Sequence, residues 1–308
     1  MIDIFLKLLP FFSLVLIGYL FKSKFSFANG FVKYLTRFVL YLSLPAVLLG
    51  KISITDYNAL VDSSFLLAYL LSITTVMMVS VLICYLCFSK GMKYSLMLGL
   101  GGVYGNVGFL AIPVLTVIIG EWVSVPLALI LTLDLLILLP VTTFLLQLNS
   151  TNSLNNITYT QAFKRSFINP LILSILIGGI LSFFQIRLPG VLIHSLDWVG
   201  SAAGPCAMFI VGTALYGKDI NKKPIAAVSM SVLKLIVTPS IVYLFMSWFS
   251  VDREWTIVAT LGAAMPCAAV LGVIAAEHKV LVQQASTAVL ITTVFSVITI
   301  PLLIFTLI

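Results

Sequence analysis

An aspartate and a lysine lie deep inside apolar stretches of this 308-residue chain. Asp134 lies about ten residues into the stretch 123–148 and Lys234 about ten residues into the stretch 225–249, which places both near the middle of a bilayer. An unpaired charge there costs roughly 2.5–3.5 kcal/mol, so such residues usually serve pairing, ion coupling or ligand binding. We therefore expect the two charges to influence each other, either as a structural salt bridge or within a transport site.

Asn106 is a third polar residue at that depth, and it adds a hydrogen-bond donor and an acceptor. It lies in the apolar stretch 98–119, which is interrupted by Gly101, Gly102, Gly105, Gly108 and Pro113. A helix broken there turns unpaired N–H or C=O groups toward whatever fills the gap. Close helix packing through small residues is the alternative reading.

A second stretch, 255–276, carries Gly262, Pro266 and Gly272 at half depth. Two interrupted helices in corresponding positions are the best sequence pointer to a substrate site at the bilayer midplane. This second break favours a binding site over simple packing.

The composition is that of a helical membrane protein that crosses the bilayer many times. Hydrophobic residues make up 61% of the chain and charged residues 9%, and the mean hydropathy is +1.19. The net charge of +7 does not indicate nucleic-acid binding, because the basic residues occur in short groups between apolar spans.

Hydropathy predicts about ten spans, five on each side of a polar linker at 149–166. We expect a first repeat at 1–148 and a second at 167–308. The spans are 2–21, 31–49, 65–88, 95–119, 123–148, 167–185, 192–216, 225–249, 255–276 and 282–307.

Proline spacing supports an internal repeat. Four prolines of the first half have partners in the second at offsets of 160, 160, 153 and 161, namely Pro10, Pro45, Pro113 and Pro140 with Pro170, Pro205, Pro266 and Pro301. Five spans per half would make the two repeats inverted.

Basic residues in the connections set the orientation. Twelve lie on one set of alternate connections and three on the other, Lys51, Arg187 and Arg253. The positive-inside rule places the basic set in the cytoplasm and both termini outside, in the inner (plasma) membrane.

Several segments resemble the auxin efflux carrier family, which includes plant PIN auxin exporters and bacterial permeases for malonate or malate. They are LYLSLPAVLL at 40–49, GNVGFLAIP at 105–113, NPLILSILIG at 169–178, LKLIVTP at 233–239 and MPCAAVLGVIAAEH at 265–278. The resemblance covers nearly the whole chain.

That resemblance implies the fold of bile-acid transporters and sodium–proton antiporters, in which helices 4 and 9 unwind and cross at Pro113 and Pro266 and an organic anion binds beside the crossing. It implies a scaffold of helices 1, 2, 6 and 7, often dimeric, and a transport bundle of helices 3–5 and 8–10. Relatives often carry an asparagine shortly after the second proline, whereas this chain has Ala268, Ala269, Val270 and Leu271.

We therefore predict a secondary transporter of a small organic anion that works by alternating access. It would be driven by an ion gradient, with H⁺ or Na⁺ as the coupling ion, or by the anion's own gradient. The predicted substrate-binding residues are Asn106, Gly105, Pro113, Pro266, Cys267 and Lys234, and the predicted coupling or gating residues are Asp134, Glu277 and His278. A channel or facilitator is the alternative. An intramembrane enzyme fits poorly, because the chain has two histidines, no HExxH or GxSxG motif and one mid-membrane aspartate, so we expect no catalytic residue, cofactor or metal.

Overall fold

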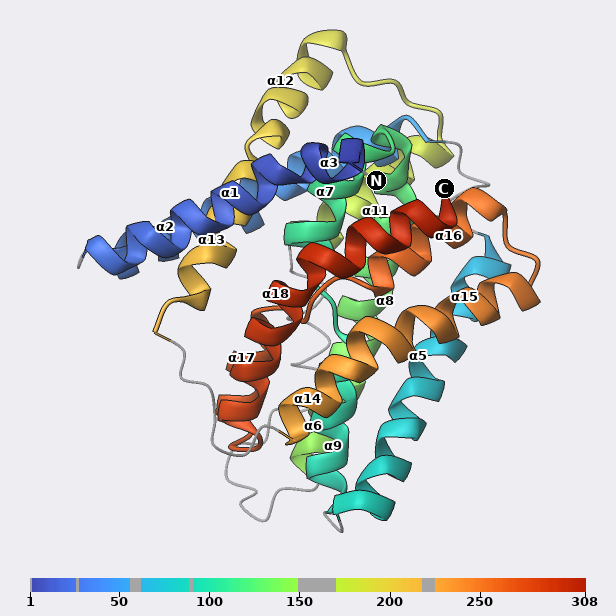
Figure 1. Cartoon of the computed structure of the whole chain (residues 1–308). Helices are drawn as coiled ribbons and strands as arrows, with labels where there is room; N and C mark the ends of the chain where they lie inside the picture. Colours follow the sequence, from blue (N-terminus) through green and yellow to red (C-terminus); the bar gives the residue numbers. More distant parts are fainter. Residues whose placement is uncertain (1, 26–27, 56–61, 89–90, 149–169, 218–224) are drawn as a thin grey trace. The chain divides into compact units, whose positions relative to one another are not determined.

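The computed structural model describes residues 2–25, 28–55, 62–88, 91–148, 170–217 and 225–308, and these form helices joined by short connections (Figure 1). Five helical spans among them are long and apolar enough to cross a membrane: Gly30–Ser53, Ser63–Leu86, Glu121–Leu148, Ile225–Trp248 and Val282–Leu307. Two shorter apolar helices cover Val107–Ile118 and Pro170–Phe183. The chain is an all-helical, polytopic membrane protein, as its composition predicts. The predicted linker 149–166 lies outside the described residues.

Large apolar side chains remain exposed along these helices. Examples are Met78 on α5 (Ser63–Ile83), Leu244 on α15 (Thr238–Trp248) and Ile298 on α18 (Val282–Leu307), each more than half exposed. So much exposed apolar surface suits hydrocarbon as the surrounding solvent.

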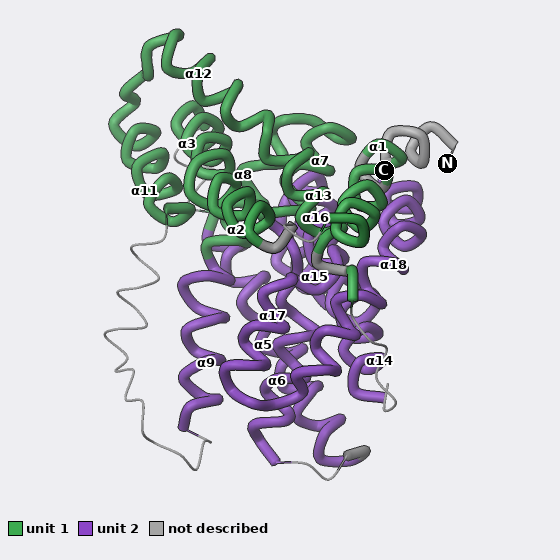
Figure 2. Tube along the Cα trace, turned by 90° about the vertical axis from the view of Figure 1, so that its left-hand side faces the viewer, with its two compact units in different colours: residues 1–62, 108–132, 167–217 green, residues 63–107, 133–166, 218–308 purple. Residues whose placement is uncertain are grey.

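The chain forms two compact units (Figure 2). Unit 1 comprises residues 1–62, 108–132 and 167–217, and unit 2 comprises residues 63–107, 133–166 and 218–308. Each unit combines segments from both halves of the sequence. The inverted five-helix repeats, and the division into scaffold and transport bundle, stay predictions.

Unit 1 is built around one pair of packed helices and one group of three. α1 (Ile2–Lys24) packs against α13 (Ala203–Leu215), and α3 (Leu44–Ser53) packs against α11 (Pro170–Phe183) and α12 (Gly190–Ser201). A Cβ at Gly18 would meet the carbonyl of Phe209, and a Cβ at Gly212 would meet the carbonyl of Val15. These two glycines therefore permit the close approach of α1 and α13, as small residues do between membrane helices. Unit 1 also holds α2 (Ala28–Phe38), α7 (Ile112–Ile118) and most of α8 (Ser124–Leu133).

Unit 2 contains the second set of helices. α5 packs against α6 (Met92–Val103) and α15, and α14 (Ile225–Val232) packs against α6 and α18. α16 (Arg253–Ala263) lies against α15, α17 (Val270–Glu277) lies against α18, and α9 (Leu139–Leu148) contacts α6.

Four prolines inside helical spans are each preceded by a π-helical segment that ends two residues earlier. The segments are Val39–Ser43 before Pro45, Val107–Ala111 before Pro113, Asp134–Leu138 before Pro140 and Leu233–Val237 before Pro239. Proline lacks an N–H and its ring clashes with the carbonyl four residues back, so a wider turn accommodates it. The bonds show this directly, because Leu139 N–H donates to the Asp134 carbonyl and Thr238 N–H to the Leu233 carbonyl, each five residues back.

Both mid-membrane charges predicted from the sequence lie on such wide turns. Asp134 begins one of them and Lys234 is the second residue of another. The prolines thus set the direction in which each charged side chain leaves its helix.

Candidate functional site

The first part of the first broken helix is α6, in unit 2. Regular helix stops at Val103, Tyr104 adopts an extended conformation, and helical structure resumes at Val107. Gly101 and Gly102 remain inside α6, so the interruption is at Tyr104, Gly105 and Asn106.

The second broken helix is interrupted between Ala263, the last residue of α16, and Val270, the first residue of α17. Pro266 lies in this gap. The two gaps meet, because Gly105 and Cys267 form an antiparallel bridge.

Backbone hydrogen bonds satisfy the groups that the two breaks release. Asn106 N–H donates to the Pro266 carbonyl at 2.8 Å, and Ala268 N–H donates to the Tyr104 carbonyl at 3.2 Å. Hydrocarbon offers no partner for free backbone groups, so two interruptions that pair with each other can persist at membrane depth.

Cys267 anchors the crossing to neighbouring helices. Its N–H donates to Thr292 Oγ1 on α18 at 3.0 Å, and its Sγ–H donates to the carbonyl of Gly101 at 3.1 Å. The thiol acts here as a buried hydrogen-bond donor.

Lys234 joins the ends of the two interrupted helices. Its Nζ donates to the Val103 carbonyl at 2.8 Å and to the Ala263 carbonyl at 2.7 Å, and these residues end α6 and α16. The C-terminal end of a helix carries a partial negative charge, so one ammonium group offsets two helix ends. Within the described part of the chain two of its three donors are used, and the third is left for a further acceptor.

Gly105 gives Lys234 the room to do this. A Cβ at position 105 would lie 2.7 Å from Nζ and 3.0 Å from Cε of Lys234. No larger residue fits there unless the lysine moves.

Asn106 is 6% exposed, and its side-chain amide makes no hydrogen bond with the described residues. The segment that pairs with Asn106, at Pro266 and Cys267, leads into α17. The first turn of α17 has no side-chain cap. An amide and an uncapped helix N-terminus are groups that bind a carboxylate.

Asp134 is buried, at 1% exposure, and accepts a hydrogen bond from the Tyr69 hydroxyl on Oδ1 at 2.9 Å. Its Oδ2 is buried and has no hydrogen-bond partner among the residues that the structure describes. Asp134 and Lys234 do not form an ion pair within 4.0 Å, although they are near enough for their charges to interact. A buried carboxylate that makes one hydrogen bond is costly, which suits a site that takes up a proton or cation.

The comparisons with known proteins agree with this architecture. A family model described as "Membrane transport protein" matches residues 3–304. The chain belongs to that family, the auxin efflux carriers. The transporter is also 29% identical over 301 residues to a Rhizobium meliloti (strain 1021) protein named "Putative malonate transporter", an alignment that covers 95% of this chain and 92% of the relative.

The structure brings most of the predicted substrate-binding residues of the transporter together. Gly105, Asn106, Pro266, Cys267 and Lys234 all belong to the crossing in unit 2. The expectation that both helices unwind at their prolines needs a correction at Pro113. The chain crosses at Gly105, eight residues earlier, because the wide turn Val107–Ala111 lets Pro113 enter the first turn of α7 without a break.

The predicted gating residues lie at the end of α17. Glu277 is its last residue, and His278 follows in a tight turn in which Lys279 and Leu281 have left-handed backbone conformations. Burial lowers the pKa of His278 below its usual 6.5, and Lys93 adds to this effect while Glu277 opposes it.

Sequence reasoning missed the residues that support the site. Tyr69, Thr292 and Thr238, whose Oγ1 donates to the Gly102 carbonyl at 2.7 Å, come from helices far away in the chain. Thr238 could have been found from the sequence, since it immediately precedes Pro239, the proline that follows the wide turn Leu233–Val237. Among the described residues, no group of three or more His, Cys, Asp or Glu side chains is placed to hold a metal ion.

Proposed function

We propose that the protein is a secondary transporter of small organic anions such as malonate, malate or auxin-like carboxylates, which it moves by alternating access at the crossing of its two interrupted helices. The observation that carries this proposal is the Gly105–Cys267 bridge, with the unbonded amide of Asn106 beside it. Membership of a transporter family and the name of the R. meliloti relative support it.

The anion is held mainly by neutral dipoles. The Asn106 amide donates to one carboxylate oxygen, and the start of α17, which has no side-chain cap, presents its positive dipole end to the other. Leu271 N–H and Gly272 N–H already donate to the carbonyls of Ala268 and Ala269. Lys234 contributes its third donor and its charge, while its other two donors keep the crossing intact. Pro266 and Cys267 shape the gap. Pro113 lies in α7 of unit 1, and its part in substrate binding stays a prediction.

Asp134 is the proposed coupling residue, with Glu277 and His278 as gating residues at the end of α17. Proton uptake by Asp134 would remove the negative charge that acts on Lys234 and so strengthen the attraction of the ammonium group for the anion, and proton and anion would move together. Na⁺ is the alternative coupling ion. Asp134→Asn should flatten the pH dependence of uptake while the protein still folds, because the amide keeps the shape and the bond to Tyr69 but cannot titrate. An unchanged pH profile would place the coupling elsewhere.

The experiment that tests the function is counterflow in proteoliposomes that contain the purified protein. Vesicles loaded with an unlabelled acid are diluted into labelled malonate, malate, hexanoate or an aromatic acid. Transient accumulation above equilibrium is the expected result for at least one of them. Conductance without counterflow would indicate a channel, and no movement of any carboxylate would contradict the proposal.

The membrane, the orientation and the oligomeric state of the protein are part of the proposal. The protein lies in the inner (plasma) membrane with both termini outside, as the distribution of basic residues favours. A homodimer formed through the scaffold helices is part of the same proposal.

A further inference from the structure

Unit 1 contains a cavity of about 650 Å³ whose walls are largely apolar. They are formed by α1, α3, α7 and the start of α13, through residues such as Pro10, Val47, Ile112, Pro113 and Pro205. Lys51 is the basic residue among the described residues that line it. The cavity thus combines one cationic group with an apolar interior.

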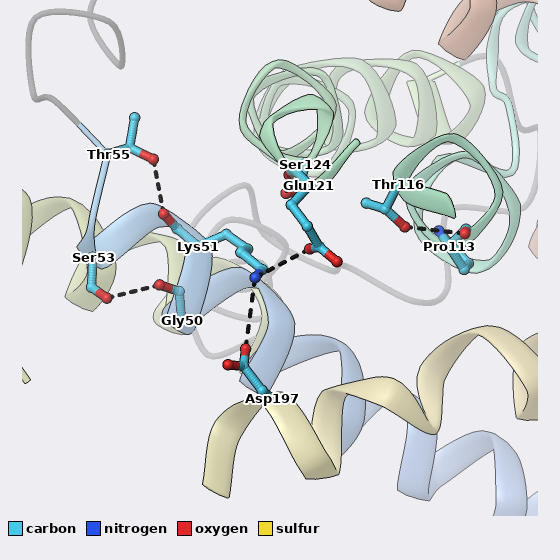
Figure 3. Close-up of polar contacts among 9 residues, drawn as sticks. All are labelled: Gly50, Lys51, Ser53, Thr55, Pro113, Thr116, Glu121, Ser124 and Asp197. Carbon is cyan, nitrogen blue, oxygen red and sulfur yellow. Dashed lines mark hydrogen bonds and ion pairs between the residues drawn. The ribbon is translucent and has the colours of Figure 1, made fainter. Parts of the chain in front are cut away.

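Two carboxylates hold the ammonium group of Lys51 (Figure 3). Its Nζ lies 3.1 Å from Glu121 Oε2 and 3.7 Å from Asp197 Oδ1. The Lys51 side chain is 23% exposed, whereas those of Glu121 and Asp197 are 69% and 46% exposed. The cation is largely sheltered, and its partners are not.

The three charged residues come from separate elements. Lys51 is in the last turn of α3, Asp197 is on α12, and Glu121 begins a short 3₁₀ turn after Gly120. Gly120 has φ of +140°, a backbone conformation that residues with a side chain rarely adopt, so the chain turns there and places Glu121 at the cavity.

Ion pairs with such exposed carboxylates contribute little, because solvent screens them and both side chains lose conformational freedom. A carboxylate that enters the cavity is shielded from water by the apolar walls and meets the same ammonium group under a lower effective dielectric. When Lys51 exchanges Glu121 and Asp197 for the carboxylate of a ligand, little free energy is lost with the exposed ion pairs. More is gained from the ion pair that the apolar walls shelter from water.

We propose that Lys51 is a ligand-binding residue whose ammonium group exchanges Glu121 and Asp197 for the carboxylate of an organic anion, and that the apolar walls take the hydrocarbon part of that anion. The inference rests on the proposed function and adds an anion-binding site of unit 1 to the one proposed at the crossing in unit 2. The ligand class of this added site is a monocarboxylate with an apolar body. A small dicarboxylate fits less well, because its second charge would face apolar walls or the displaced carboxylates.

Equilibrium binding of radiolabelled hexanoate and malonate to the purified full-length protein tests this. Hexanoate should bind more tightly than malonate. Lys51→Gln should weaken hexanoate binding roughly tenfold or more, as expected on loss of a hydrogen bond from a charged donor. Lys51→Arg should keep binding within about threefold of the unsubstituted protein, because it keeps the charge.

The decisive variant is Glu121→Gln, which removes a competitor for the lysine and should strengthen hexanoate binding about threefold. A purely structural ion bridge predicts that Lys51→Gln and Glu121→Gln change binding in the same direction or not at all. Lys279→Gln, which removes an exposed lysine that does not line the cavity, is the matched charge control and should leave binding unchanged. Thermal unfolding of each variant identifies loss of fold.

The outcomes separate the two proposals. Binding of either acid without opposite effects of Lys51→Gln and Glu121→Gln overturns the inference and leaves the proposed function standing. Malonate binding that responds to Lys51→Gln and Glu121→Gln as strongly as hexanoate binding does overturns the ligand class assigned to this site. Absence of binding and of counterflow for every acid overturns the proposed function and this inference with it.

Discussion

Lys234 shows how a single buried charge is satisfied in this protein. Its depth in an apolar span predicts that it needs a partner, and Asp134 is the candidate that the sequence offers. In the structure its hydrogen bonds go to the backbone carbonyls of Val103 and Ala263, at the ends of two helices. Such carbonyls are invisible as acceptors in a sequence, because they become available only where helices end.

Gly105→Ala should disrupt the crossing, because the new Cβ would lie 2.7 Å from Nζ of Lys234 and displace it from its two carbonyls. We expect lower thermal stability and loss of transport. Gly108→Ala is the matched control, since a Cβ there would lie 3.6 Å from its nearest neighbour, an ordinary contact. Equal behaviour of the two variants in thermal unfolding and uptake would show that the close approach of Gly105 and Lys234 is unimportant.

Prolines act on whole helices here, and their effect depends on the turn before them. Pro45, Pro113, Pro140 and Pro239 follow wide turns, and the helices continue through them. Pro301 lies inside α18, and no π-helical segment precedes it. A proline in a sequence therefore predicts an irregularity without fixing its kind, which is why Pro113 was a poor guide to the break.

Pro239→Ala restores an N–H and allows the wide turn Leu233–Val237 to become regular α-helix. A wide turn holds one residue more than a turn of α-helix. Its conversion to regular α-helix would therefore rotate Lys234 by about 100° relative to α15 and take Nζ away from the two carbonyls that it contacts. We expect strongly reduced uptake with the protein still inserted in the membrane, measured in proteoliposomes. Pro301→Ala should retain uptake, because no wide turn depends on it. Full activity of Pro239→Ala would mean that the wide turn does not position the lysine.

At the scale of the whole molecule, the sequence predicts those features that a bilayer requires of any protein that crosses it. Spanning a bilayer requires long apolar helices, so composition and hydropathy predict a polytopic helical protein and the two interrupted stretches. The partners of the site were not predictable in the same way. The bonds of Tyr69 to Asp134 and of Thr292 to Cys267, and the contacts of Lys51 with Glu121 and Asp197, join segments far apart in the chain, and no local pattern encodes them.

The orientation of the molecule is a prediction that labelling can check. Gly91→Cys should react only with reagents that reach the cytoplasm and Ser63→Cys only with reagents outside, because the basic connections are expected inside. Both positions are exposed, and a Cβ at Gly91 meets nothing within 4 Å. Modification of Gly91→Cys by an impermeant reagent from outside, with Ser63→Cys protected, would reverse the topology.

The binding of an organic anion beside the crossing is tested most directly at Asn106. Counterflow is measured as a function of substrate concentration for the unsubstituted protein, Asn106→Ala and Asn106→Asp, with thermal unfolding as the control for folding. Loss of one hydrogen bond to a charged group should raise the apparent KM of Asn106→Ala about tenfold or more. Asn106→Asp should lose more, because a similarly shaped side chain then repels the carboxylate. An unchanged KM in both variants would contradict an anion site at the crossing.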